Sequence, residues 1–382
     1  MTGNIASASS LNVSGAGPKT LHIPSLDSQH EAHTSRLYSL HVAEHYIISG
    51  SADRTVRLWL KNTCQLALPP LLGHEGAVTA VELSEELGLG ISGDSKGVMI
   101  LWRLRDGHMM QRLEAHEDVV QALTVRGTTL VSTSRDLSAK VWQVKGGKAQ
   151  SENSSEASGA MTGDVEIDLE LRHTFRGHTM NVADAHISHD GEYVYTTSGD
   201  RSLRVWDLET GECVHGYEGL ASMLRFQLIH EGRGTTVVGA GTDSTVRVYD
   251  VDIQDGTCAE LACLEGHTGV VRSVDIIRGP SGSSKGVGED WKIVSAGYDG
   301  TVKVWGRREE AGALLDWGCV ETLSFSDEML TPVTDFNHQE LTEEGFVIVK
   351  NIPNRVMDMQ VDGRWIYCCG EGAEIVAWEL HV

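Results

Sequence analysis

The sequence predicts an all-β protein in which seven similar four-stranded sheets are arranged around one axis as a β-propeller. A segment of alternating apolar and polar residues, ending in an aromatic side chain, recurs seven times along the chain. Two further short segments precede it in most repeats, with the two-residue period and the β-branched residues of strands. The 42 glycines against 7 prolines provide many tight turns. Because one such sheet cannot bury both faces alone, the copies are expected to stack.

The aromatic residue that ends each repeat marks the length of that repeat. These residues are Trp59, Trp102, Trp142, Trp206, Tyr249, Trp305 and Trp378. The shorter intervals between neighbours are about 40 to 43 residues, which is the length of one four-stranded blade. The longer intervals contain predicted polar loop insertions at about 145–168, 278–290 and 306–350. The Ser- and Gly-rich residues 1–18 are predicted to be a disordered tail, and residues 19–382 to form the propeller.

A Gly-His or Ala-His dipeptide recurs within this pattern, and from His33, His74, His116 and His178 the Trp follows after 26–28 residues. The dipeptide begins at Gly73, Gly177 and Gly266, and Ala-His replaces it at Ala32 and Ala115. This arrangement resembles the WD40 repeat, and the resemblance covers residues 20–382. The fifth repeat departs from it with Gly-Leu and Tyr in place of Gly-His and Trp, and the seventh has no Gly-His.

The family resemblance implies how the ring closes. In WD40 proteins the outer strand of the last blade comes from the N-terminal segment, which removes an exposed sheet edge. Thr20–Ile23, an alternating segment before the first repeat, is therefore predicted to pair with the strand that ends near Trp378. The expected fold is a seven-bladed WD40 propeller closed by an N-terminal strand in its last blade.

A histidine, a serine or threonine and an aspartate recur together in four repeats, with the residue types of a hydrolase triad. In WD40 proteins these residues and the Trp form a buried hydrogen-bonded chain, which satisfies polar groups inside the blade. Four copies also argue against one active site, and the sequence has no G-x-S-x-G, H-E-x-x-H or P-loop motif. No catalytic residue, and no enzyme, is expected. The predicted structural tetrads are His33, Ser49, Asp53 and Trp59; His116, Ser132, Asp136 and Trp142; His178, Thr196, Asp200 and Trp206; and His267, Ser295, Asp299 and Trp305.

Charge and cysteine content narrow the class of partner. The chain has 31 Lys and Arg against 54 Asp and Glu, a net charge of −23. Direct nucleic-acid binding, which needs basic surface, is therefore not expected. The seven cysteines are scattered and lack the spacing of a metal site, so no metal and no cofactor are expected. Without a signal-peptide pattern or a long apolar stretch, the chain is expected in the cytoplasm, the nucleus or both, and not at a membrane.

In WD40 proteins the face around the central channel commonly binds partners, and two positions in each blade point toward it. One position follows the first apolar residue of the first strand, and the other precedes the turn aspartate. Arginine and tyrosine gather at these positions in an otherwise acidic chain, and guanidinium groups pair with carboxylates and phosphates through two hydrogen bonds. The predicted partner-binding residues at the channel mouth are Arg135, Arg225, Arg272, Tyr298 and Tyr38.

The predicted function is that of a protein–protein interaction scaffold or adaptor subunit of a larger complex. The alternative rests on the segments 31–59 and 266–305, which resemble the propellers of F-box/WD proteins. That resemblance implies a substrate-recognition propeller of a cullin-RING ubiquitin ligase, which reads phosphorylated or acidic peptides through arginines at the channel mouth. No F-box is recognisable before residue 20.

Overall fold

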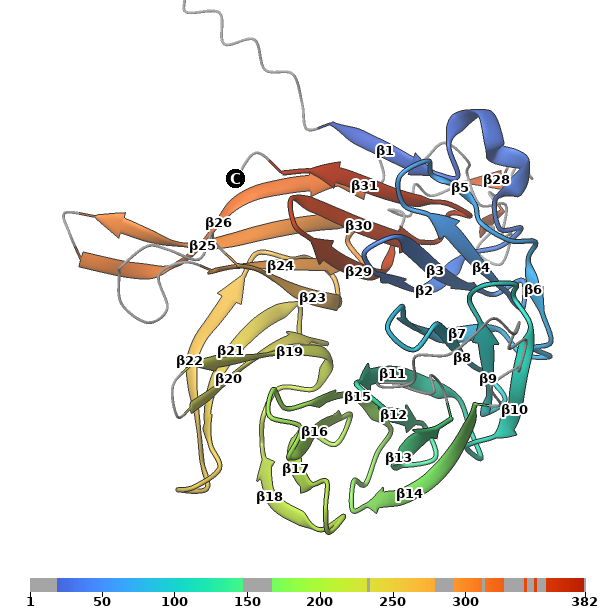
Figure 1. The fold of residues 1–382 in the computed structure, drawn as a ribbon. Helices are drawn as coiled ribbons and strands as arrows, with labels where there is room; N and C mark the ends of the chain where they lie inside the picture. Colours follow the sequence, from blue (N-terminus) through green and yellow to red (C-terminus); the bar gives the residue numbers. More distant parts are fainter. Residues whose placement is uncertain are drawn as a thin grey trace, which may run out of the picture.

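The computed structural model describes residues 19–146, 167–231, 234–278, 291–310, 313–325, 340–341, 347–348 and 355–380. Within these residues the fold is all-β, apart from one short 3-10 helix at Leu26–Glu31. Seven antiparallel sheets are arranged radially around a central channel, as Figure 1 shows. The seven-bladed propeller expected from the repeats is therefore confirmed.

The first strand of each repeat is the innermost strand of its blade, and these seven strands contact one another in a closed circle. Blade 1 contains β2 (Leu37–Val42), β3 (Tyr46–Ser51), β4 (Thr55–Leu60), β5 (Gln65–Leu66) and β6 (Leu71–Leu72), and blade 2 contains β7 (Val78–Ser84), β8 (Leu89–Asp94), β9 (Val98–Arg103) and β10 (Met109–Glu114). Blade 3 contains β11 (Val120–Arg126), β12 (Thr129–Ser134), β13 (Ser138–Lys145) and β14 (Asp168–Arg176), and blade 4 contains β15 (Val182–Ile187), β16 (Tyr193–Ser198), β17 (Ser202–Asp207) and β18 (Cys213–Glu218).

The remaining blades follow the same order from the channel outward. Blade 5 contains β19 (Met223–Glu231), β20 (Gly234–Gly241), β21 (Thr245–Asp252) and β22 (Thr257–Glu265), and blade 6 contains β23 (Val271–Arg278), β24 (Trp291–Gly297), β25 (Thr301–Glu310) and β26 (Ala313–Ser324). Blade 7 contains β29 (Val356–Asp362), β30 (Trp365–Gly370), β31 (Ile375–Glu379) and β1 (Thr20–Ile23). A separate pair, β27 (Glu340–Leu341) and β28 (Val347–Ile348), forms a small two-stranded sheet.

The ring closes through the N-terminal strand, as the sequence predicted. β1 pairs antiparallel with β31, with Thr20 opposite Trp378 and Ile23 opposite Ile375. Ile23 is buried in a core cluster that also contains Leu37 of blade 1. Residues from the two ends of the chain therefore share one sheet and one core, and the last blade has no missing strand.

The hydrophobic core lies between the blades. Each of the seven core clusters joins residues of two neighbouring blades, such as Leu58 of blade 1 with Trp102 of blade 2. This arrangement follows from the two-residue period of the strands, because alternate side chains point to opposite faces of each sheet. Every blade is therefore stabilised from both sides, and the rigidity of the ring fixes the loops at the channel.

The predicted insertions are only partly within the described residues. The tail 1–18 and most of the predicted loops 145–168 and 278–290 lie outside them, as does much of 306–350. The prediction of a loop from residue 306 is wrong for its first part, because β25 and β26 pair as far as Glu310 opposite Ala313. The two strands continue as a hairpin beyond the blade, and Figure 1 shows this ribbon projecting outward from the ring.

Candidate functional site

The four predicted tetrads form the hydrogen-bonded chains expected of them. In blade 1 the Trp59 indole N–H donates to Ser49 Oγ at 2.8 Å, and Ser49 Oγ lies 2.9 Å from His33 Nε2. The ionised Asp53 carboxylate can only accept, so Nδ1–H donates to Asp53 Oδ2 at 2.9 Å and Nε2 accepts the Ser49 hydroxyl. The imidazole is thus a neutral link between strand, loop and turn.

This connectivity is that of a Ser-His-Asp triad, but the hydroxyl is inaccessible. Ser49 is 0% exposed and Trp59 1% exposed, so no substrate carbonyl reaches the Oγ atom. The same order of contacts recurs in the tetrads anchored by His116, His178 and His267. The chains therefore hold the blades together and leave no exposed nucleophile.

A fifth tetrad, which the sequence reasoning missed, lies in blade 2. His74 Nδ1 is 3.0 Å from Asp94 Oδ2, His74 Nε2 is 2.6 Å from Ser92 Oγ, and the Trp102 indole donates to Ser92 at 2.8 Å. The aspartate comes two residues after the serine here and four residues after it in blade 1. A usable signal was present, because the His-to-Asp separation is 20 residues in both blades.

The tetrad carboxylates are held in their ionised form. Burial works to raise the pKa of Asp200, but hydrogen bonds from Ser202, Thr179 and His178 outweigh it and lower that pKa to about 2. Burial likewise opposes the shift at Asp53, where the donors again prevail and its pKa falls well below the usual range. Each of these blades therefore holds one buried, hydrogen-bonded carboxylate within its tetrad.

The channel is lined by polar side chains that join each blade to the next. Asp358 of blade 7 accepts the backbone N–H of Leu40 in blade 1 at 3.2 Å. Asp275 of blade 6 accepts the N–H of Val361 in blade 7 at 2.7 Å. The same contact from one blade to the next is made by Ser39, His41, Glu82, Asp184 and Gln360. Most of the charged side chains inside the channel therefore join neighbouring blades.

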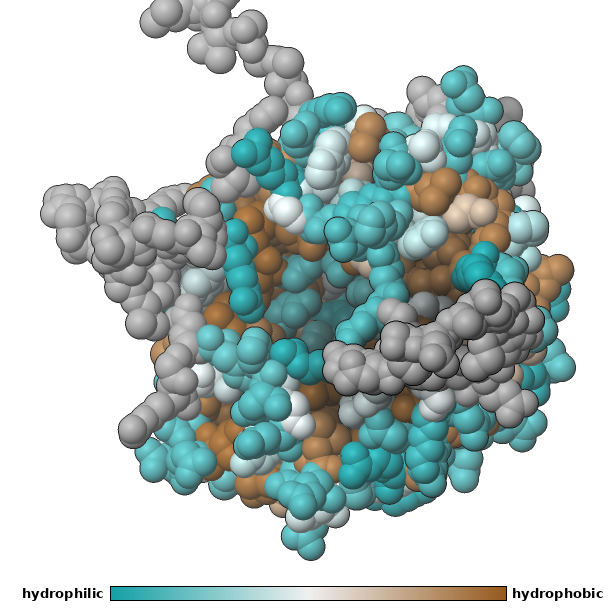
Figure 2. Space-filling model, in the orientation of Figure 1, coloured by the Kyte–Doolittle hydropathy of each residue, from teal (hydrophilic) through white to brown (hydrophobic). Residues whose placement is uncertain are grey.

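These groups surround a cavity of about 220 Å³. In Figure 2 its hydrophilic wall is visible at the centre of the molecule. Burial raises the pKa of Glu82 to about 8 and that of Asp275 to about 6, so Glu82 is largely protonated at neutral pH. Burial also lowers the pKa of His41 to about 4, which keeps Nδ1 free to accept the N–H of Leu83.

The expected position of Arg225 at the channel mouth is wrong by one residue. Each inner strand carries a bulge after its first residue. In blade 1 Leu37 and Ser39 have partners on β3, and Tyr38 between them has none and takes the mouth position. In blade 5 the equivalent residues are Met223 and Arg225. Leu224 therefore takes the mouth position, and Arg225 lies one step deeper, where it lines the cavity.

The deeper position gives Arg225 a structural partner. Its guanidinium is 3.2 Å from Asp184 Oδ1 in blade 4, and it also donates to the backbone oxygen of Gln121 in blade 3 at 3.4 Å. Burial opposes the charge of Arg225, but the Asp184 carboxylate outweighs burial and raises its pKa. Arg225 thus ties three blades together and does not present a free cation at the mouth.

The other predicted mouth residues are not gathered into one site. Arg272 and Tyr298 interact electrostatically on blade 6, and the Arg355 guanidinium, which the sequence analysis did not single out, lies 5.3 Å from the centre of the Tyr298 ring. On blade 1, Arg36 lies 5.9 Å from the centre of the Tyr38 ring. Arg135 is exposed on blade 3, without a side-chain contact among the described residues. Arginine stacked on tyrosine therefore occurs over blades 6, 7 and 1.

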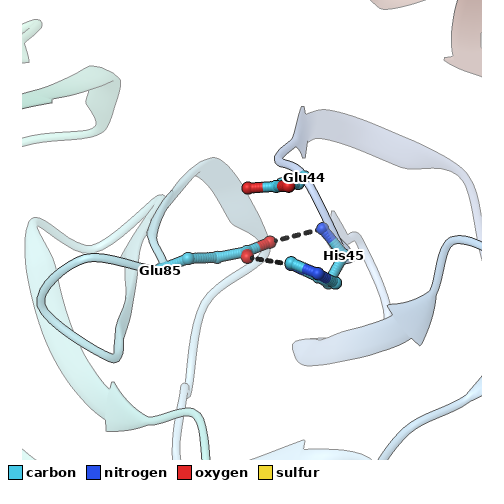
Figure 3. A group of neighbouring side chains, drawn as sticks. All are labelled: Glu44, His45 and Glu85. Carbon is cyan, nitrogen blue, oxygen red and sulfur yellow. Dashed lines mark hydrogen bonds and ion pairs between the residues drawn. The ribbon is translucent and has the colours of Figure 1, made fainter.

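One cluster has the residue types of a metal site. Glu44, His45 and Glu85 are the only group of three candidate ligands within 4.8 Å among the described residues. Figure 3 shows that Glu85 points at the turn before β3, where its carboxylate accepts the N–H groups of His45 at 2.7 Å and Tyr46 at 3.1 Å and contacts His45 Nδ1 at 2.8 Å. Through these contacts Glu85 links blade 2 to blade 1, as the channel residues do for other blades.

The closed ring of seven blades, with its buried tetrads and its polar channel, defines a β-propeller that presents loops around a channel opening on each of its two faces. The family model described as "WD domain, G-beta repeat" matches residues 25–59, 169–207 and 258–306. The chain therefore contains WD40 repeats within a seven-bladed propeller. Among the described residues, no helix has the length and hydropathy of a membrane span.

Several curated proteins are similar in sequence. A ribosome biogenesis protein WDR12 homolog of Culex quinquefasciatus is 25% identical over 294 residues, which are 74% of this chain and 65% of that protein. Ribosome biogenesis protein YTM1 of Eremothecium gossypii is 26% identical over 304 residues, 72% and 64% of the two chains. The chain thus spans somewhat under two thirds of the length of these relatives. A p21-activated protein kinase-interacting protein 1-like protein of Xenopus laevis is 23% identical over 286 residues, 74% and 67%.

The fold also matches solved structures. The crystal structure of the WD40 β-propeller domain of Doa1 superposes with a TM-score of 0.62 over 91% of this chain and 94% of that domain. The two sequences are 19% identical over this match. This likeness concerns the architecture of the ring.

Proposed function

We propose that the protein is an interaction scaffold, an adaptor subunit that docks a protein partner on the channel mouth over blades 6, 7 and 1. The observation that carries the proposal is Arg272. Its half-buried guanidinium has no hydrogen bond or ion pair among the residues that the structure describes. Burial, and next the charge of Arg225, lower the pKa of Arg272, so an anionic group from a partner would be favoured beside it.

The surroundings of Arg272 suit a protein ligand. Tyr298 lies beside it, and Arg355 covers the Tyr298 ring while its Nε is 3.8 Å from the Glu371 carboxylate. Tyrosine and arginine are the residue types that most often dominate the energy of protein interfaces, because they combine large apolar area with hydrogen-bonding groups. Arg36 and Tyr38 extend the same chemistry onto blade 1.

The kind of assembly is proposed from the relatives. The match to ribosome biogenesis proteins covers about three quarters of this chain, and we infer that the complex belongs to ribosome assembly and that the protein works in the nucleus. With a net charge of −23, direct contact with RNA is the less favourable mode, because RNA phosphates bind basic surface. Other proteins of the assembly are the expected partners.

The proposed role is non-catalytic. The hydroxyls of the tetrads are covered by their own Trp side chains, as at Ser49 and Ser132. The channel carboxylates accept backbone N–H groups of the next blade, as at Asp358 and Asp275. Neither set has a free group positioned for proton transfer or attack on a substrate.

An acidic or phosphorylated segment is the ligand that Arg272 favours, because a guanidinium binds carboxylate or phosphate through paired hydrogen bonds. Arg225, already bound to Asp184, is not available to such a ligand. The role of a ubiquitin-ligase substrate receptor is not favoured, since the curated relatives described above are ribosome biogenesis proteins and a kinase-interacting protein.

The test is quantitative affinity purification of the tagged protein, with mass spectrometry of the copurifying proteins. Arg272→Ala and Tyr298→Ala should each reduce recovery of the main partners, while melting temperatures stay within about 2 °C of the wild type because surface changes cost little. Arg172→Ala is the matched control, since Arg172 lies on the outer strand β14. Equal recovery with all four proteins contradicts docking at the mouth, and phosphatase treatment separates phosphate-dependent from acid-dependent binding.

A further inference from the structure

The end of the channel opposite the mouth carries a basic cluster in this acidic chain. The inner strands run from the mouth to this end, and Arg126, His230 and Arg278 lie at the far ends of β11, β19 and β23. His189 follows the far end of β15. All four side chains are exposed. Blades 3 to 6 therefore each place a cationic or imidazole side chain around the same opening.

His189, Arg126 and Arg278 all act electrostatically on His230. Burial is the largest influence lowering the pKa of His230, and the charges of His189, Arg126 and Arg278 lower it further against the opposing charge of Asp190. The two arginines thus act on one imidazole from blades on either side of it. Among the described residues, neither arginine has a side-chain hydrogen bond or ion pair.

The histidines form a rigid centre between the two arginines. The backbone N–H of His189 donates to His230 Nε2 at 3.2 Å, and the two rings lie 6.2 Å apart, edge to face. Since Nε2 accepts, Nδ1 carries the ring proton and donates to Thr235 Oγ1 at 3.2 Å. Tyr195 in blade 4 also donates to Thr235, at 3.3 Å. This network fixes the turn of blade 4 against blade 5 and keeps His230 neutral.

The acid nearest to the cluster is already engaged. Asp190 accepts the Ser188 hydroxyl at 2.5 Å and the backbone N–H of Glu192 at 3.0 Å, and these bonds lie within its own turn. Arg126 and Arg278 therefore keep their charges directed to solvent. In a chain of net charge −23, two arginines on one rim that pair with no acid among the described residues make the local potential less negative than that of the rest of the surface.

We propose that this opening is a second docking surface, which binds an acidic polypeptide segment of a partner through Arg126 and Arg278. Carboxylate side chains of an extended segment would pair with the two guanidinium groups, and the aromatic edges of His189 and His230 would lie beneath the chain. Outside the two openings the acidity of the surface would repel an acidic segment, which limits where such a segment can dock. A partner at each opening would make the protein a bridge between two components.

The experiment measures binding of fluorescently labelled octaglutamate to the full chain by fluorescence anisotropy. We expect saturable binding that weakens with salt, and a Kd raised about tenfold in the Arg126→Ala/Arg278→Ala double variant, as for two rim ion pairs lost. Arg172→Ala should leave the Kd unchanged. Arg272→Ala removes only octaglutamate bound at the mouth and should not reproduce the loss seen in the double variant, so failure at this opening is distinguishable from failure at the mouth.

Two results would overturn the proposal. One is octaglutamate affinity that is unchanged in the double variant, because the arginines would then not form the site. The other is labelled oligouridylate binding more tightly than octaglutamate, with the same loss in the double variant, because the rim would then be an RNA contact. Circular dichroism of the double variant checks that the ring remains folded, and Arg126→Lys/Arg278→Lys should retain binding if charge at this rim is what matters.

Discussion

Arg225 Nη1 lies 3.2 Å from Asp184 Oδ1 inside the channel, and this ion pair links blade 5 to blade 4. The same guanidinium reaches the backbone of Gln121 in blade 3. A residue that has the appearance of a ligand-binding arginine in the sequence is therefore part of the framework. The contrast with Arg272, which has no such partner among the described residues, separates the cation that stabilises the ring from the one available to a partner.

The first prediction concerns this ion pair. Arg225→Leu should lower the free energy of unfolding by about 3–5 kcal/mol, because it leaves the buried Asp184 carboxylate without its counter-charge. The double variant Arg225→Leu/Asp184→Asn should recover most of the loss, since the amide oxygen still accepts the N–H of Phe226. Urea unfolding measures both. A single variant as stable as the wild type would show that the pair does not support the ring.

The second prediction concerns closure. Ile23 is 1% exposed and packs in the cluster shared by blades 7 and 1, so Ile23→Ala should cost about 2–4 kcal/mol. Val320, which is 52% exposed on the outer strand of blade 6, provides the control: Val320→Ala should cost under about 0.5 kcal/mol. Chemical denaturation compares the two variants. Similar unfolding midpoints would contradict the claim that the N-terminal strand stabilises the closed ring.

The third prediction concerns the tetrads and acid. The pKa of Asp200 is lowered to about 2 from an unfolded value near 3.8, so its contribution to stability is present above pH 4 and is lost as the pH falls toward 2. Asp200→Ala should lower the free energy of unfolding by about 1–3 kcal/mol at pH 7, because it strands buried donors. The deficit relative to the wild type should shrink between pH 4 and pH 2.5. A deficit that stays constant over this range would contradict the claim that the ionised Asp200 stabilises the folded state.

The fourth prediction concerns Glu82 and alkaline pH. Burial raises its pKa to about 8, so the folded state binds its proton more tightly than the unfolded state does. The contribution of Glu82 to the free energy of unfolding is therefore fully present below pH 4.5, and it is lost as the pH rises to about 8. Glu82→Gln retains the acceptor for Val125 N–H and removes the charge, so it should be more stable than the wild type at pH 8.5 and nearly equal at pH 5. Thermal unfolding at the two pH values tests this, and a variant less stable at pH 8.5 would refute it.

Much of the ring could be predicted from the sequence, because its features recur. The spacing of His33 to Trp59 and the alternation of each strand repeat from blade to blade, so one correct repeat predicts the others. The irregular positions were harder to predict. In blade 2 Asp94 takes the part of the turn aspartate although it lies two residues closer to the tetrad serine than Asp53 does in blade 1. The bulge in β19 moves Arg225 one residue further into the channel. Both depend on local register, which alternation alone does not fix.

The partners of the channel residues were also beyond the sequence. Asp275 and Val361 are brought together by the docking of blade 6 against blade 7, and nothing local to either segment indicates that contact. Arg355 was missed for the same reason, since its partner Tyr298 belongs to the preceding blade. The sequence therefore indicated which residues face the channel, but it did not indicate which of them are already paired with a neighbouring blade.

The most direct test of the account is hydrogen–deuterium exchange of the protein alone and bound to a partner recovered by affinity purification. Docking at the mouth predicts slower exchange in the partner complex for segments 268–274, 296–300 and 355–358, which contain Arg272, Tyr298 and Arg355. Exchange in the outer strand β14 should not change. Protection confined to the outer strands, with the mouth segments unchanged, would contradict the claim that the channel mouth is the docking surface.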